Sequence, residues 1–155
     1  MPTAQQGLPL MIQLALIPLL VACSVFFSLA HAQTQNIIIN QSVPDQKITA
    51  TQLRSIFSMK RRNWNDGEAI TVVVLNDTNP SHIKFCKQVL NVYPHQMRRL
   101  WDRQVYSGTG QAPIEVSSEE EMKQLIASTP GAIGYIMSDT LITDKGINIL
   151  EGIQR

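Results

Sequence analysis

Two short stretches of small and polar residues have the types and spacing that could hold an oxyanion. The first, Ser107-Gly108-Thr109-Gly110 (the SGTG run), is spaced by glycines, so its backbone N–H groups could wrap around an anion. An anion-binding loop usually follows a strand and precedes the first turn of a helix. The SGTG run instead follows a segment with helical periodicity and precedes the extended stretch PIEV. Its position therefore favours a helix stop, with Gly108 as the residue that ends the helix.

The second stretch, DTNPS, has the expected order, because it follows the apolar run ITVVVL and Pro80 suits a first helical turn. Backbone N–H groups at this helix start could hold an anion, aided by polar side chains. Asp77 could cap the helix or accept a proton from a protonated oxyanion, although its carboxylate repels a dianion. Pro80 also removes one backbone donor. The stretch therefore predicts a weak anion site, whose residues are Asp77, Thr78, Asn79 and Ser81.

Two clusters of basic residues lie beside tryptophans. Lys60-Arg61-Arg62 precedes Trp64, and three arginines, Arg98, Arg99 and Arg103, surround Trp101. These clusters are interpreted as solvated surface, with an anion-binding or partner-binding surface as the alternative, since arginine offers bidentate contacts. The secondary candidates for ligand binding are Arg98, Ser107, Gly108 and Thr109. Both tryptophans are expected to pack in the core.

The remaining reactive residues predict neither an enzyme, nor a metal site, nor a cofactor. The three histidines are scattered along the sequence at His31, His82 and His95. The chain has no CxxC or HxxxH spacing and no arrangement that suggests a nucleophile with its base. Cys86 lies among apolar residues and is interpreted as a small buried side chain. The acidic run Glu119-Glu120-Glu121 suits the positive end of a helix that begins at Ser117 or Ser118, with a metal or acid–base site as the alternative.

Size and charge favour one domain that does not bind nucleic acid. The chain has 155 residues, which leaves room for one modest core. Its formal net charge is +1 and only 16% of its residues are charged. A dedicated nucleic-acid binder would normally carry a strong basic excess or stripe.

The N-terminal segment resembles an export signal. No charged residue precedes Asp45, the chain is nearly all apolar from Leu8 to Ala30, and Ala30-His31-Ala32 has the form of a signal-peptidase site. The sequence predicts a signal peptide over residues 1–32 and a periplasmic location. A retained membrane anchor that faces the periplasm is one alternative, since the run is long enough to span a bilayer. A lipoprotein signal with lipidated Cys23 is the other, and only these two alternatives imply membrane contact.

Apolar periodicity after the leader predicts a small central sheet flanked by helices. Extended segments are expected at Asn36–Asn40, Ile70–Leu75, Pro113–Val116, Ala132–Met137 and Gly146–Leu150. Helices are expected from the capping box Thr49–Gln52, from Pro80 to Leu90, from Pro94 with Met97, Leu100, Trp101 and Val105 on one face, and from Ser117 or Ser118. This order predicts an α/β (α+β-like) domain over residues 33–155.

Several segments of the domain resemble one known family. ITATQLRSIFSMKRRNWNDG is similar to the segment that links the lobes of phosphate-binding proteins of ABC importers, and TPGAIGYI is similar to their PGAIGY motif. Trp101 before a glycine-containing loop also fits, and the order is retained from Asn36 to Asp139. The chain thus resembles a short, single-lobe member of the phosphate-binding-protein-like family in the type II periplasmic-binding-protein superfamily.

This resemblance implies an exported, non-enzymatic solute-binding-like lobe, with phosphate or a similar anion as ligand and an ABC permease or another envelope protein as partner. Two departures favour the alternative of a protein-interaction, accessory or sensory module that has lost its ligand. The full-length relatives have two lobes with phosphate bound between them. Their loop after the strong strand reads like R-x-D-G-S-G-T-S, whereas Val73–Ser81 contains neither arginine nor glycine. The SGTG run corresponds to a connecting stretch in the family.

Overall fold

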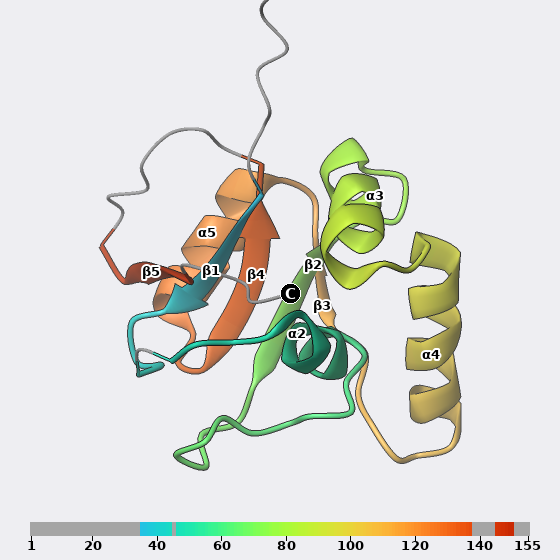
Figure 1. Cartoon of the computed structure of the whole chain (residues 1–155), viewed down its shortest axis with the longest axis horizontal. Helices are drawn as coiled ribbons and strands as arrows, with labels where there is room; N and C mark the ends of the chain where they lie inside the picture. The colour runs from blue at the N-terminus through green and yellow to red at the C-terminus, as the bar shows by residue number, and fades with distance from the viewer. Residues whose placement is uncertain (1–34, 45, 138–144, 151–155) are drawn as a thin grey trace, which may run out of the picture. The chain divides into compact units, whose positions relative to one another are not determined.

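The computed structural model of the chain describes residues 35–44, 46–137 and 145–150 (Figure 1). The predicted leader at 1–32, including Cys23 and His31, lies outside the described residues.

The described residues form a five-stranded mixed sheet, as the apolar pattern predicts. Its strands are β1 (Asn36–Asn40), β2 (Thr71–Leu75), β3 (Ile114–Val116), β4 (Ala132–Ile136) and β5 (Ile147–Leu150). The order across the sheet is β3-β2-β4-β1-β5 (Figure 1). Strands β2, β3 and β4 run parallel, while β1 pairs antiparallel with both β4 and β5. The carboxyl ends of the three parallel strands therefore lie on one edge of the sheet.

Helices pack on both faces of this sheet, as two successive residues of β4 show. Successive side chains of a strand point to opposite faces. Gly134 faces α5 (Glu119–Ser128), and it approaches so closely that an added Cβ would lie 2.6 Å from the side chain of Ile126. Tyr135 points to the other face, where its ring stacks on Phe85 at a centroid distance of 3.8 Å. The domain therefore has three layers, which agrees with the predicted fold class.

The helices begin where the capping patterns place them. They are α2 (Ala50–Phe57), α3 (Pro80–Phe85), α4 (Pro94–Tyr106) and α5. The box of Thr49 and Gln52 is formed at the start of α2, and the Ser118 hydroxyl accepts from the backbone N–H of Glu121 at the start of α5. Local hydrogen bonding thus determines these helix starts, and Ser118 rather than Ser117 is the cap.

Two helical predictions need correction. The helix predicted from Pro80 to Leu90 is α-helical only to Phe85 and continues as a π-helix, η1 (Cys86–Leu90). This wider turn closes where the N–H groups of Asn91 and Val92 both donate to the carbonyl of Cys86. The sequence predicts Val105 on the buried face of α4, but it is 43% exposed. It lies in the last turn of that helix, one turn beyond the buried Trp101, whose Nε1 donates to the Phe57 carbonyl.

Candidate functional site

The carboxyl ends of β2, β3 and β4 bring three chain segments together, and this region is called the carboxyl edge below. The loop Asn76–Asn79 follows β2, Ser117 and Ser118 follow β3, and Met137 follows β4. Both α3 and α5 begin at this edge. In open α/β sheets, ligands bind outside the carboxyl ends of the strands, so this edge is the candidate site.

Two asparagines order the loop after β2. Asn76 Oδ1 accepts from both the backbone N–H and the hydroxyl of Thr78, at 3.0 and 2.7 Å. Asn79 Oδ1 accepts from the backbone N–H of Ser81 at 2.8 Å and so caps α3. Side chains of this kind commonly bond to the backbone two residues further on. The hydroxyl of Thr78 and the backbone N–H groups of Thr78 and Ser81 are therefore already engaged within the loop.

Asp77 and Arg98, which the sequence suggests separately, meet at the carboxyl edge. Arg98 Nε and Nη2 each donate to an Asp77 carboxylate oxygen at 2.9 Å, and Nη2 also donates to Glu115 at 2.9 Å. The bond to Asp77 raises the pKa of Arg98, and the bond from Arg98 lowers the pKa of Glu115. The positive guanidinium thus neutralises the Asp77 carboxylate. The sequence alone suggests that this carboxylate would repel a dianion.

A buried chain of hydrogen bonds supports Asp77 from behind. The backbone N–H of Leu75 donates to the Tyr135 hydroxyl at 3.0 Å, and that hydroxyl contacts His82 Nδ1. His82 Nε2 lies 3.5 Å from Asp77 Oδ1, and the residue is only 1% exposed. Burial lowers the pKa of His82, against the raising effect of Asp77, so the ring is neutral at pH 7. A neutral ring that accepts from Tyr135 at Nδ1 carries its proton on Nε2, toward Asp77.

Cys86 lies beside this chain but has the properties of a structural residue. Its Sγ is 3.4 Å from His82 Nε2, and the side chain is fully buried. Burial, with a smaller contribution from Asp77, raises the pKa of Cys86 to about 12. The group therefore remains a thiol at neutral pH and is a poor nucleophile, which agrees with the interpretation as a small buried side chain.

Glu119 connects the two helices that begin at the carboxyl edge. Its Oε1 accepts from the Ser81 hydroxyl at 2.8 Å and from the backbone N–H of Met137 at 3.1 Å. The sequence predicts Glu119 as part of an acidic run at a helix start, with a metal or acid–base site as the alternative, and nothing local relates it to Ser81, 38 residues away. The edge therefore carries three carboxylates: Asp77 and Glu115, which bond to Arg98, and Glu119, which bonds to Ser81.

The SGTG run lies elsewhere and stops α4, as its position in the sequence favours. Gly108 has φ +68°, a left-handed conformation that commonly follows a helix end. The N–H groups of all four residues donate to the carbonyls of Arg103, Gln104 and Val105 in the last turn of α4, so none is directed at a ligand. Of the secondary candidates, only Arg98 joins the predicted loop.

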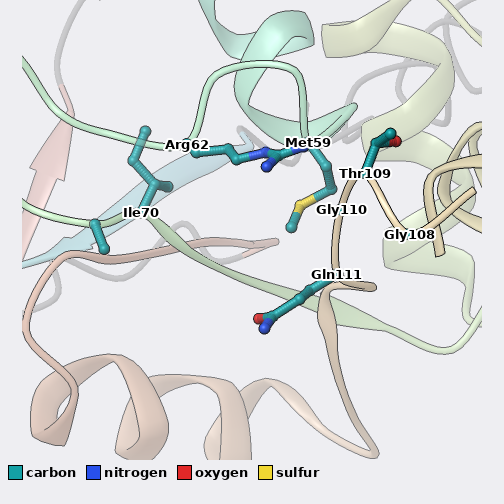
Figure 2. A pocket seen from close by; sticks show the side chains of 8 residues that line it. Met59, Arg62, Ile70, Gly108, Thr109, Gly110 and Gln111 are labelled. Carbon is teal, nitrogen blue, oxygen red and sulfur yellow. The ribbon is translucent and has the colours of Figure 1, made fainter.

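The run instead lines a separate cavity of about 400 Å³ (Figure 2). Its other walls include Met59 and Arg62 from the segment after α2, and Ile70 directly before β2. Figure 2 shows Arg62 directed across this cavity toward Gly110, and its Nη2 is 3.5 Å from the position of an added Gly110 Cβ. The cavity thus lies toward the amino end of β2, away from Asp77.

Within the described ranges, no group of three or more His, Cys, Asp or Glu side chains could hold a metal ion. The described helices are also too short or too polar to span a bilayer.

Comparison with known proteins gives results that agree with one another. Residues 36–152 match the family model of a PBP superfamily domain. The Bacillus subtilis (strain 168) phosphate-binding protein PstS is 28% identical over 114 residues, which cover 69% of this chain. The chain spans only about a third (32%) of the length of that relative.

Solved structures show the same fold. The ABC-type phosphate transport receptor from Vibrio cholerae superposes with a TM-score of 0.56 at 20% identity, over 75% of this chain and 44% of the receptor. PstS from Borrelia burgdorferi gives a TM-score of 0.51 at 21% identity, over 66% and 39% of the two chains. In both superpositions, less than half of the larger protein is matched.

Proposed function

The chain belongs to the PBP superfamily, and from that premise we propose that it is a non-enzymatic, solute-binding-like lobe that takes phosphate or a similar oxyanion at its carboxyl edge. The observation that carries the proposal is the placement of Arg98 beside the loop Asp77–Ser81, at the start of α3. Guanidinium groups bind oxyanions in bidentate fashion. The name of the Bacillus subtilis relative supports phosphate as the anion.

The donors that could serve the anion are the hydroxyls of Thr78 and Ser81, the backbone N–H of Asn79 and the guanidinium of Arg98. All of them have internal partners: the Thr78 hydroxyl and the Asn79 N–H donate to Asn76, the Ser81 hydroxyl donates to Glu119, and Arg98 donates to Asp77 and Glu115. A ligand must therefore exchange these partners, and we expect weak binding by a single lobe. A second copy or another envelope protein, such as an ABC permease, would supply the opposite wall and raise the affinity.

A second candidate function is a protein-interaction, accessory or sensory module that keeps the fold without a ligand. One observation favours it: the carboxyl edge carries three carboxylates, of which Asp77 and Glu115 bond to the guanidinium of Arg98 and Glu119 bonds to Ser81. That charge balance disfavours a dianion. Under this function the carboxyl edge would contact a basic protein surface.

Thermal unfolding of the full chain separates these functions. Phosphate at millimolar concentration is compared with sulfate and chloride at matched ionic strength, because a ligand that binds only the folded state raises its stability. We expect phosphate to raise the melting temperature more than the control salts do, and we expect the double variant Thr78→Ala/Ser81→Ala to lose this rise. The double variant Ser107→Ala/Thr109→Ala, which changes the SGTG run instead, is the matched control and should keep the rise. If phosphate raises the melting temperature no more than the control salts do, the interaction module is favoured.

We also propose a periplasmic location, with cleavage after Ala32. Mass spectrometry of the protein recovered from a periplasmic extract checks this proposal, since cleavage gives a chain that begins at Gln33. Recovery of the uncleaved chain, or of a chain lipidated at Cys23, in the membrane fraction would contradict it.

A further inference from the structure

Glu119 is the acidic side chain that reaches across the carboxyl edge. It is half-buried, and one carboxylate oxygen accepts from a hydroxyl that follows β2 and from a backbone N–H that follows β4. Its neighbours in the acidic run behave differently. Glu120 is exposed, and the Glu121 carboxylate accepts from the backbone N–H of Ser117 at the start of its own helix.

The contact of Glu119 with Ser81 conflicts with the use of Ser81 as a ligand donor. A serine hydroxyl has one proton to donate, and here that proton is directed at Glu119 Oε1. The backbone N–H of Met137 also donates to the same oxygen, at 3.1 Å. A carboxylate oxygen with a hydroxyl donor and a backbone donor has the surroundings that an oxyanion oxygen requires.

We propose that the Glu119 carboxylate is a built-in competitor of the anion, which the ligand must displace before Ser81 and Met137 can donate to it. This proposal rests on the proposed function, because it concerns the affinity of the same site. Glu119 lowers that affinity in two ways: it occupies two donors, and it places a negative charge beside the incoming anion. It is therefore the residue that sets how tightly the lobe holds phosphate.

The variant Glu119→Gln tests the proposal, because it removes the charge while keeping the size of the side chain and an oxygen that can accept. Glu120→Gln is the matched control, since it makes the same change of charge at the adjacent exposed residue. Phosphate affinity of the full-length protein is measured by isothermal titration at one ionic strength. We expect Glu119→Gln to bind phosphate roughly tenfold or more tightly than Glu120→Gln, because a charge-assisted contact no longer has to be broken.

Two further measurements separate competition from a purely structural role. Adding Ser81→Ala to Glu119→Gln should abolish the gain, because the freed hydroxyl is then missing. The amide resonance of Met137 should shift when phosphate saturates the unsubstituted protein, since its acceptor changes. Unfolding temperatures without phosphate identify any variant that fails to fold, and Glu119→Ala provides a second variant without an acceptor.

The outcomes distinguish this inference from the function on which it rests. If the unsubstituted protein binds phosphate and the two glutamine variants bind equally well, the inference is wrong while the function stands. If only the Glu119 variants bind phosphate, competition by Glu119 is supported. The proposal that the unsubstituted lobe binds phosphate by itself is then wrong. If no variant binds phosphate, both the proposed function and the inference are overturned.

Discussion

The two ends of the parallel strands are held by different kinds of contact. At the amino end, the contacts involve the backbone: the carbonyl of Gly131 accepts from Trp64 Nε1 at 2.9 Å and from the N–H of Thr71 at 3.2 Å. At the carboxyl edge, side chains contact side chains, as in the pairs Asp77–Arg98 and Ser81–Glu119. Contacts of the first kind fix the fold, whereas contacts of the second kind can exchange one partner for another without moving the backbone.

The comparison extends to the two stretches that resemble anion loops. Both contain small hydroxyl residues, but Asp77–Ser81 leads into the first residues of a helix and the SGTG run follows one. N–H groups at a helix start have no partner within the helix, whereas those just after its end can cap the last carbonyls. Composition alone therefore does not identify an anion loop, and its position relative to a helix does.

The substitution Gly131→Ala should have the largest effect, because it disturbs the sterically fixed amino end. Gly131 has φ +70°, and an added Cβ would lie 2.2 Å from the carbonyl oxygen of Ala69. Strain and this clash together should lower the free energy of unfolding by about 3 kcal/mol or more, measured by urea denaturation. Gly67→Ala is the control, because Gly67 has φ +92° with nothing within 4 Å of the added Cβ. Gly67→Ala should lower the free energy of unfolding by about 1 kcal/mol. If Gly131→Ala lowers it by no more than this control, the clash with Ala69 is relieved by movement of the backbone.

Tyr135→Phe should have the next largest effect, since it removes the buried hydroxyl that supports the carboxyl edge. The N–H of Leu75 then loses its acceptor, and His82 Nδ1 loses its donor. Leaving a buried polar group unpaired costs about 1–3 kcal/mol. The same substitution at Tyr106, which is 88% exposed, should change stability little in the same denaturation experiment. A small loss at Tyr135 would mean that water replaces the hydroxyl.

The dependence of stability on pH tests whether His82 is buried in its neutral form. Its pKa in the folded state is lowered mainly by burial, so the unfolded chain binds a proton more readily than the folded chain. Stability from this group is therefore present above pH 6.5, the unfolded pKa, and is lost as the pH falls toward the folded value. Denaturation between pH 7.5 and 5.5 should show this decline, His82→Gln should reduce it, and His95→Gln should leave it unchanged. An unaltered decline in His82→Gln would assign it to other groups.

The sequence predicts those features that depend on neighbours along the chain. The capping box at Thr49, the buried strand before Asn76 and the helix stop at Gly108 are all local patterns, and the structure contains each of them. The contacts of the candidate site join residues far apart in sequence, 21 residues for Asp77–Arg98 and 53 for His82–Tyr135. Only folding brings these side chains together, so spacing could identify the candidates but not their pairing.

The smallest effect is expected at Gly108, where the comparison of the two loops is sharpest. Its left-handed φ has open space around it, so Gly108→Ala should lower the free energy of unfolding by only about 1 kcal/mol. Gly108→Asn should cost less than alanine, because asparagine tolerates this conformation better. Neither variant should alter the response of the melting temperature to phosphate, because the N–H groups of the run are bonded to α4. If both variants lose the response to phosphate, the anion binds at the SGTG run instead. The contacts at the carboxyl edge would then serve only the stability of the fold.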